Sequence, residues 1–261
     1  MTLESLQGQM LAYTLLLPRF ISCFVMLPVL SKQMLGGAMI RNGVVCSLAL
    51  FAYPMVADTL PPAIDALDLA LLVAKEVLLG LLIGFVAAIP FWAVEASGFL
   101  VDNQRGAAMA SLFNPSLASQ TSPTGLLLTQ TLITLFFSGG AFLALLSALF
   151  QSYASWPVTR FFPAIGDLWV SFFYSQFSQM LLCALLAAPL LIAMFLAEFG
   201  LALISRFAPS LNVFVLAMPI KSAVASLLLV IYIKLMMDHA YRQVLAVMDP
   251  LQLLAPILEA R

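Results

Sequence analysis

The chain has 261 residues, of which 63% are hydrophobic and 9% are charged, and its mean hydropathy is +1.08. Soluble domains are about 45–50% apolar and about 25% charged, so this composition excludes an ordinary soluble protein and indicates a membrane protein. The net charge of −1 provides no basic surface of the kind that nucleic-acid binding requires.

Apolar segments broken by glycine, proline and charged residues predict six helices. No charged residue occurs between Arg105 and Arg160, an interval long enough for at least one helix of the roughly 20 residues that cross hydrocarbon. In chain order, the predicted helices are Leu6–Leu30, Ala38–Val56, Asp68–Arg105, Thr124–Phe150, Leu168–Phe207 and Ser210–Val247. The third and fifth are too long for one plain crossing and contain Pro90 and Pro189, so we expect each to be kinked or split. The pattern predicts an all-α membrane protein with one helical domain.

The charges of the loops give a partial orientation. Lys32 and Arg41 flank the first turn, whereas the second turn, residues 58–68, holds three acids and no base. The positive-inside rule therefore puts the first turn in the cytosol. Six full spans would then place the basic C-terminal end of the chain, with Lys234, Arg242 and Arg261, on the opposite side. Either one segment is re-entrant or the hairpins are not ordinary spans.

Glu76, Gly80 and Gly84 follow one another at a spacing of four residues. This spacing puts them on one face of a helix, where glycines let a second backbone approach closely. We expect close helix packing on this face. A carboxylate near the end of an apolar helix also needs a donor, so Glu76 is a candidate contact to another subunit.

A polar patch, residues 95–106, ends the third predicted helix. Asp102 and Arg105 are three residues apart and can pair on a helical surface, and Glu95 lies two turns earlier on the same face. This patch is either a solvated helix end or a support for the loop that follows. A proton relay is less favoured, because the arginine already neutralises the nearest acid.

The loop at residues 106–124 is small, hydroxylated and uncharged, with two prolines, and Phe113 is its largest side chain. Such a sequence does not form a continuous helix. Irregular backbone at membrane depth is tolerated only where protein buries it or where it lines a watery cavity. The loop is therefore either a surface linker or a segment that lines or plugs a pore.

The most informative segment, Glu198–Ser222, places an arginine, an asparagine, a lysine and two prolines in apolar sequence. An ionisable group at the centre of a membrane helix costs about 2.5–3.5 kcal/mol on insertion scales, so Arg206 and Lys221 need partners. Pro209 and Pro219 each remove a backbone donor. The segment is expected to face protein or a cavity. A secondary transporter with a broken-helix site at Pro209–Pro219 is the alternative, but the first half of the chain has no matching interruption.

Little in the sequence points to catalysis or to a cofactor. Lys234, Asp238 and Arg242 follow at a spacing of four and predict a solvated ladder of two ion pairs near the end of the last helix. His239 is the only histidine, and the three cysteines lack the short spacings of metal sites or disulfide frameworks. No phosphate loop or nucleophile elbow occurs. We therefore expect neither an enzyme nor a bound cofactor.

Arg206–Ser222, with the sequence RFAPSLNVFVLAMPIKS, resembles the signature of the T component of the bacterial type III secretion export apparatus. This SctT family is related to the flagellar protein FliR. The Arg-Phe-x-Pro start, the Leu-Asn-x-Phe centre and the Pro-x-Lys end match in order and spacing. The residues RFAP and MPIKS resemble the injectisome branch more closely than the flagellar branch. Weaker matches along most of the chain are Arg19 with Pro28, Glu76 with Gly80 and Gly84, and Gly98 and Asp102 with Gln104-Arg105-Gly106.

The resemblance implies a core component of an export gate for unfolded protein substrates, in the bacterial inner membrane and within the basal body. One copy would assemble with several SctR (P-type) and SctS (Q-type) subunits, beside the U-type switch protein and the V-type export ring. In this family the hydrophobic hairpins wrap into a cone held largely above the bilayer. Proton-motive force and an ATPase on partner proteins would supply the work, so the gate itself is passive.

The resemblance also assigns roles to single residues. The loop at 106–124 becomes a candidate pore plug, with the C-terminal tail at 248–261 following the last helix. The plug candidates are Met109, Phe113, Asn114 and Pro115. The candidates for buried polar contacts between subunits are Glu76, Asp102, Arg105, Glu198, Arg206, Asn212 and Lys221.

Overall fold

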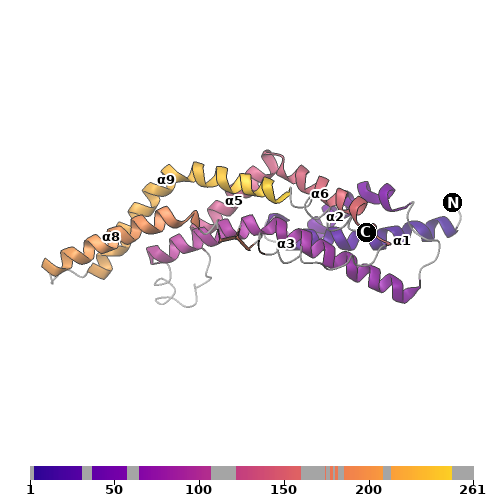
Figure 1. Cartoon of the computed structure of the whole chain (residues 1–261), viewed down its shortest axis with the longest axis horizontal. Coiled ribbons are helices and arrows are strands. Elements are labelled where there is room, and N and C mark those ends of the chain that lie inside the picture. The colour runs from indigo at the N-terminus through magenta and orange to yellow at the C-terminus, as the bar shows by residue number, and fades with distance from the viewer. Residues whose placement is uncertain are drawn as a thin grey trace. The chain divides into compact units, whose positions relative to one another are not determined.

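The computed structural model describes residues 3–30, 37–57, 65–106, 122–159, 185–207 and 213–248, with five further residues between 174 and 181. Within these ranges every regular element is a helix (Figure 1). The elements are α1 (Leu3–Met26), the short 3-10 helix η1 (Pro28–Leu30), α2 (Ala38–Ala57), α3 (Ala66–Arg105), α5 (Pro123–Ser138), α6 (Ala141–Ser155), α8 (Ala188–Phe207) and α9 (Val213–Met248).

The first three predicted helices and the last one are confirmed to within a few residues. α1 ends shortly before Pro28, and η1 takes up the remainder of the first predicted helix. α3 is one continuous helix of 40 residues with Pro90 inside it, so it is not split there. α9 likewise continues through Pro219. Its last described residue is Met248, so the tail beyond lies outside the described residues.

The fourth predicted helix, Thr124–Phe150, is wrong as a single element. It is two helices, α5 and α6, separated at Gly139 and Gly140. Gly140 has a φ of 82°, in the left-handed region that only glycine adopts without strain. Uninterrupted apolar sequence on both sides concealed this break.

The fifth predicted helix is interrupted, as expected, beside Pro189. A turn at Leu186 and Ala187 precedes α8, and Pro189 then occupies the first turn of that helix. A proline is tolerated there because first-turn N–H groups have no partner within the helix.

Among the described residues, four helices are long and apolar enough to cross a membrane, or five if α5 and α6 together form one broken span. They are α1, α3, α8 and α9. Length and composition thus agree with the membrane class that the sequence predicts.

The described helices group into two compact units, whereas the sequence predicts one domain. The first unit comprises residues 1–89, 137–176 and 244–261, and the second comprises residues 90–136 and 177–243. The boundary within α3 therefore falls at Pro90.

The core of the first unit is built on one stripe of α1. Buried side chains recur there at positions 12, 15, 16, 20, 23 and 24, the spacing of a single helix face. Phe20 packs against Phe150 and Tyr153 of α6, with ring centroids 5.9 and 6.0 Å away. On another side of α1, Tyr13 stacks on Tyr53 of α2 at 5.1 Å.

The predicted close packing at Gly80 and Gly84 is confirmed. A Cβ atom on Gly80 would overlap the backbone carbonyl of Arg19, and one on Gly84 would overlap the backbone of Cys23. α1 and α3 therefore cross with their backbones almost in contact. This crossing brings the C-terminal part of α1 against the first half of α3.

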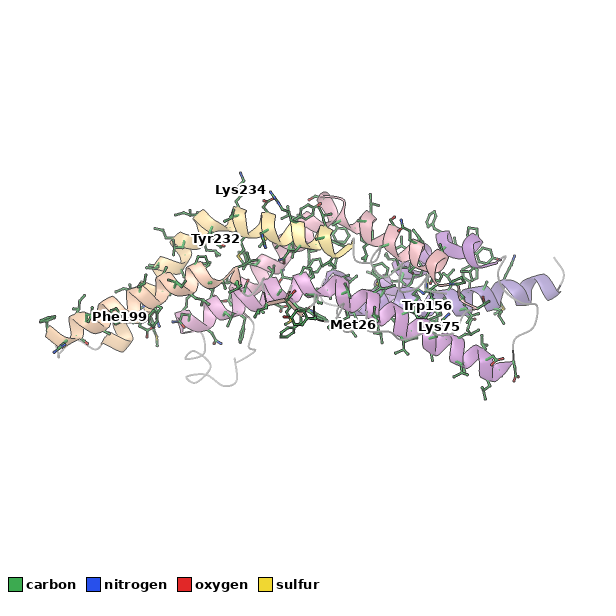
Figure 2. All side chains as sticks on the ribbon, viewed as in Figure 1. Met26, Lys75, Trp156, Phe199, Tyr232 and Lys234 are labelled. Atoms are coloured by element: carbon green, nitrogen blue, oxygen red, sulfur yellow. The ribbon has the colours of Figure 1, made fainter. Side chains whose placement is uncertain are left out.

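The second unit has a small core at the meeting of α3, α8 and α9. Its buried members are Val101, Ala187, Leu190, Met194 and Ala225. Only 11% of the apolar stretch of α8 is buried inside the chain, and only 11% of that of α9. In α3 the buried share is 67%. Large side chains such as Phe199 stand exposed on α8 (Figure 2).

Candidate functional site

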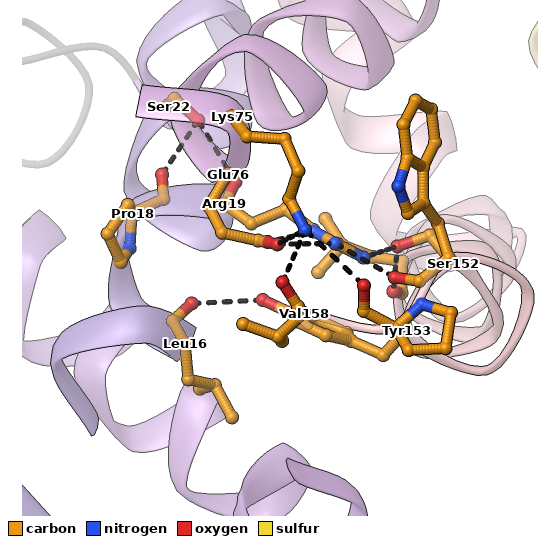
Figure 3. A network of polar contacts seen from close by, with 12 residues as sticks. Leu16, Pro18, Arg19, Ser22, Lys75, Glu76, Ser152, Tyr153 and Val158 are labelled. Atoms are coloured by element: carbon orange, nitrogen blue, oxygen red, sulfur yellow. Dashed lines mark hydrogen bonds and ion pairs between the residues drawn. The ribbon is translucent and has the colours of Figure 1, made fainter. Parts of the chain in front are cut away.

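A buried ion pair joins α1 to α3. Arg19 donates from Nε to Oε2 of Glu76 at 2.6 Å and from Nη2 to Oε1 at 3.0 Å, so both carboxylate oxygens are used (Figure 3). Both side chains are fully buried. Paired hydrogen bonds of this kind fix the geometry as well as the charge. The donor that Glu76 was predicted to need is therefore supplied within the chain.

Lys75 adds a second cation to the same carboxylate. Its Nζ lies 2.9 Å from Oε1 of Glu76 and donates to the backbone carbonyl of Val158 at 2.6 Å. The carbonyl of Pro157 accepts from it at 3.3 Å. These contacts hold the segment that follows α6 against α3. We refer to Arg19, Lys75 and Glu76 as the buried charge cluster.

The end of α6 completes the surroundings of Arg19. The guanidinium of Arg19 donates to Oγ of Ser152 at 3.0 Å and to the carbonyl of Trp156 at 3.2 Å. The centre of the Tyr153 ring lies 3.9 Å from Cζ of Arg19, a cation–π contact. The Tyr153 hydroxyl in turn donates to the carbonyl of Leu16 at 2.9 Å.

The buried charge cluster contains two cations and one anion, all withdrawn from solvent. Backbone carbonyls at 156, 157 and 158 accept the hydrogen bonds that the single carboxylate cannot. The cluster ties together α1, α3 and the end of α6. Its hydrogen bonds and ion pairs hold these three elements together.

A second polar site lies at the end of α3. Asp102, which is 6% exposed, accepts a hydrogen bond from Oγ of Ser122 at 2.6 Å. It also accepts two from Thr124, at 2.9 Å from the backbone N–H and at 2.6 Å from Oγ1. Asp102 therefore binds the first turn of α5, on the far side of the loop predicted as a plug.

Both ends of that loop are fixed to helices. Ser122 is the N-cap of α5, because its Oγ accepts the N–H of Gly125 at 2.9 Å, and Pro123 takes the favoured first helical position. At the other end Gly106 terminates α3 with a φ of 98° and lies against Met218 of α9. Asp102, one member of the predicted polar patch, thus contacts Ser122 and Thr124 at the other end of the loop.

Arg105 pairs with Asp102 as predicted, although loosely. Its Nη1 lies 3.7 Å from the carboxylate, and Nη2 lies 3.5 Å from Oγ of Ser226. Nε of Arg105 has no hydrogen-bond partner among the residues that the structure describes. Glu95, the third member of the predicted patch, is exposed.

A third site joins α8 to α9. Lys221 donates to Oε2 of Glu198 at 3.0 Å. The lysine side chain is 12% exposed and the glutamate side chain 45% exposed. Lys221 and Glu198, which both belong to the apolar segment Glu198–Ser222, therefore neutralise each other. Arg206, near the end of α8, is exposed.

Other predicted residues have different outcomes. Of the ladder on α9, Arg242 and Asp238 pair at 2.8 Å, both exposed, while Lys234 is exposed one turn earlier. Asn212 and the plug candidates Met109, Phe113, Asn114 and Pro115 lie outside the described residues. Within the described ranges no three His, Cys, Asp or Glu side chains gather as a metal site would require.

Sequence reasoning missed Lys75 as a member of the buried charge cluster, and it missed Ser152 and Trp156 as partners of Arg19. Lys75 is next to Glu76 in the sequence, but its hydrogen bond to Val158 spans 83 residues, and the hydrogen bonds of Arg19 to Ser152 and Trp156 span 133 and 137 residues. The available signal was a lysine inside an apolar helix, beside a glutamate that already needed a partner.

These features define a helical membrane protein in which ion pairs join α1 to α3 and α8 to α9. The chain belongs to the family described as bacterial export proteins, family 1, whose sequence model matches residues 10–247.

Several relatives carry names from protein secretion. Yop proteins translocation protein T of Yersinia pestis is 72% identical, over 99% of this chain and 100% of its own length. Secretion system apparatus protein SsaT of Salmonella typhimurium is 36% identical, over 85% of this chain and 86% of its own. Flagellar biosynthetic protein FliR of Bacillus subtilis is 28% identical, over 84% and 85%. The chain is thus a membrane component of a type III secretion export apparatus, related to FliR.

Proposed function

We propose that the chain forms part of the wall and the seal of the pore through which unfolded proteins leave the cell. In this proposal it acts without covalent chemistry. Partner proteins supply the energy, and the chain contributes a passage that is closed at rest. Its place is the inner membrane, within the basal body of the secretion system.

One observation carries the proposal. α8 and α9 leave most of their apolar surface uncovered, and the half-exposed carboxylate of Glu198 lies on that hairpin. Lys221 pairs with Oε2 of that carboxylate, but lipid tails offer its exposed part no hydrogen bonds, so further protein or water should lie beside it. Further subunits around a water-containing passage would provide both.

The partners we propose are SctR (P-type) and SctS (Q-type) subunits in direct contact, with the U-type switch protein and the V-type ring nearby. Arg206, Asn212 and Lys221 remain candidate contacts to them. An unpaired charge at such a contact penalises wrong partners, so these residues would favour correct assembly.

The seal we propose is the loop between α3 and α5. Its anchoring at both ends supports this, because a plug must return to the same place after each passage. The uncharged side chains at Met109, Phe113, Asn114 and Pro115 suit a plug that must block ions yet move aside for a polypeptide.

Deletion of residues 111–120 tests this seal and leaves both anchored ends intact. The assembled apparatus should then conduct ions at rest, measured as current across a planar bilayer or as ion leakage from cells. A matched control replaces the same residues with a Gly-Ser linker of equal length, which keeps the span but removes the bulky side chains. Unchanged resting conductance in both variants would reject the loop as the seal.

A further inference from the structure

We propose that Asp102 is a positioning residue for the seal, because it ties the end of α3 to the start of α5 and so fixes both ends of the loop between them. The inference rests on the proposed function in one respect, namely that this loop closes the pore. The residues that carry it are all described: Asp102, Ser122, Thr124 and Gly125, which we call the stem.

The position of Asp102 in its own helix is unfavourable. It lies in the last turn of α3, where the negative end of the helix dipole disfavours an acid. The same carboxylate faces the first turn of α5, where unpaired N–H groups and the positive end of the dipole favour it. Its interactions therefore serve the junction between the two helices.

The hydrogen bonds of the stem form a closed set. Oδ2 of Asp102 accepts from Ser122 and from the N–H of Thr124, while Oδ1 accepts from the Thr124 hydroxyl. Ser122 at the same time accepts from Gly125. Each donor of the first turn of α5 named here is thereby satisfied, and most of them by a carboxylate on another helix.

The packing of the stem leaves α5 little freedom to shift. A Cβ atom on Gly98 would overlap the backbone of Gly125, so α3 and α5 cross at van der Waals contact one turn before Asp102. At the end of α3, a Cβ atom on Gly106 would lie 3.5 Å from the side chain of Met218. The contacts at Gly98 and at Asp102 therefore both oppose separation of α3 and α5.

The test compares resting ion conductance of the assembled apparatus for two variants of the stem. Asp102→Asn removes the charge at constant size, and Thr124→Val removes one donor at constant shape. Losing a hydrogen bond to a charged group shifts an equilibrium roughly tenfold or more, so we expect resting conductance to rise by about that factor. Asp238→Asn, an exposed acid on α9, is the matched control and should change nothing.

Each stem variant is also combined with the deletion of residues 111–120. A positioning residue has nothing left to position in that background, so the double variants should leak no more than the deletion alone. Extra leakage in the double variants would overturn the inference in favour of general damage to packing. If Asp102→Asn prevents assembly, Thr124→Val decides the question by itself.

The outcomes separate this inference from the proposed function. A deletion that leaks, together with stem variants that assemble and stay tight, overturns the role of Asp102 and leaves the seal in place. A deletion that does not leak overturns the seal and this inference together.

Discussion

Glu76→Gln is the substitution that tests the buried charge cluster most sharply. It changes the shape of the side chain very little but removes the only anion beside two buried cations, Arg19 and Lys75. The guanidinium then keeps its bonds to Ser152 and Trp156, while the ammonium keeps the carbonyls that follow α6. Both cations therefore lose the carboxylate that compensates their charge at close range.

The expected loss follows from this geometry. Removing one partner of a buried ion pair costs about 3–5 kcal/mol, because the remaining charge stays desolvated. That free energy lowers the ratio of folded to unfolded chain by roughly two to four powers of ten. Protein domains are stable by only about 5–15 kcal/mol, so the first unit of this chain should lose much of its stability.

The assay is the amount of chain in membranes, and its resistance to protease in detergent extracts, when it is expressed with the other apparatus components. Glu95→Gln is the matched control, the same substitution at an exposed position on the same helix. We expect strong loss for Glu76→Gln and no measurable change for Glu95→Gln. Equal behaviour of the two variants would refute the structural role of the buried charge cluster.

Three further substitutions should have graded effects. Gly84→Leu should abolish accumulation in membranes, because its side chain would enter the α1 backbone, whereas Gly200→Ala, with open space around it, should accumulate normally; comparable amounts would contradict the close crossing. Lys221→Met should reduce co-purification of partner subunits more than expression, and intact complexes at normal yield would argue against a subunit contact. Tyr153→Phe keeps the ring on Arg19 but removes the hydrogen bond to the Leu16 carbonyl, so unfolding in detergent should become easier by about 1 kcal/mol, and unaltered stability would count against that bond.

Helix content and a close helix crossing at Gly80 and Gly84 were predictable because they depend on local patterns, whereas α1 as the partner helix was not predicted. Apolar length gives the helices, and glycines at a spacing of four give the crossing at Gly80 and Gly84. The break at Gly139 and Gly140 escaped prediction, since apolar residues continue on both sides. A left-handed glycine is a choice of backbone conformation, and composition alone does not reveal it.

The partners of the charged residues were only partly predictable. Asp102 and Arg105 are three residues apart, so helical geometry suggested their contact. The shorter hydrogen bonds of Asp102 are to Ser122 and Thr124, which are 20 and 22 residues away in the sequence, so helical spacing could not predict them. Glu76 needed a donor, but only the folded chain brings Arg19 to it across 57 residues. Sequence thus indicates which groups need partners, and tertiary packing decides which partners they find.

The central claim is that this chain completes its uncovered surfaces with other subunits around a passage. Native mass spectrometry of the gently extracted apparatus tests it most directly, because it reports subunit identity and copy number together. We predict one copy of this chain bound to several small hydrophobic partner subunits. A stable chain recovered alone, with no partner and with solute transport of its own in liposomes, would contradict the account.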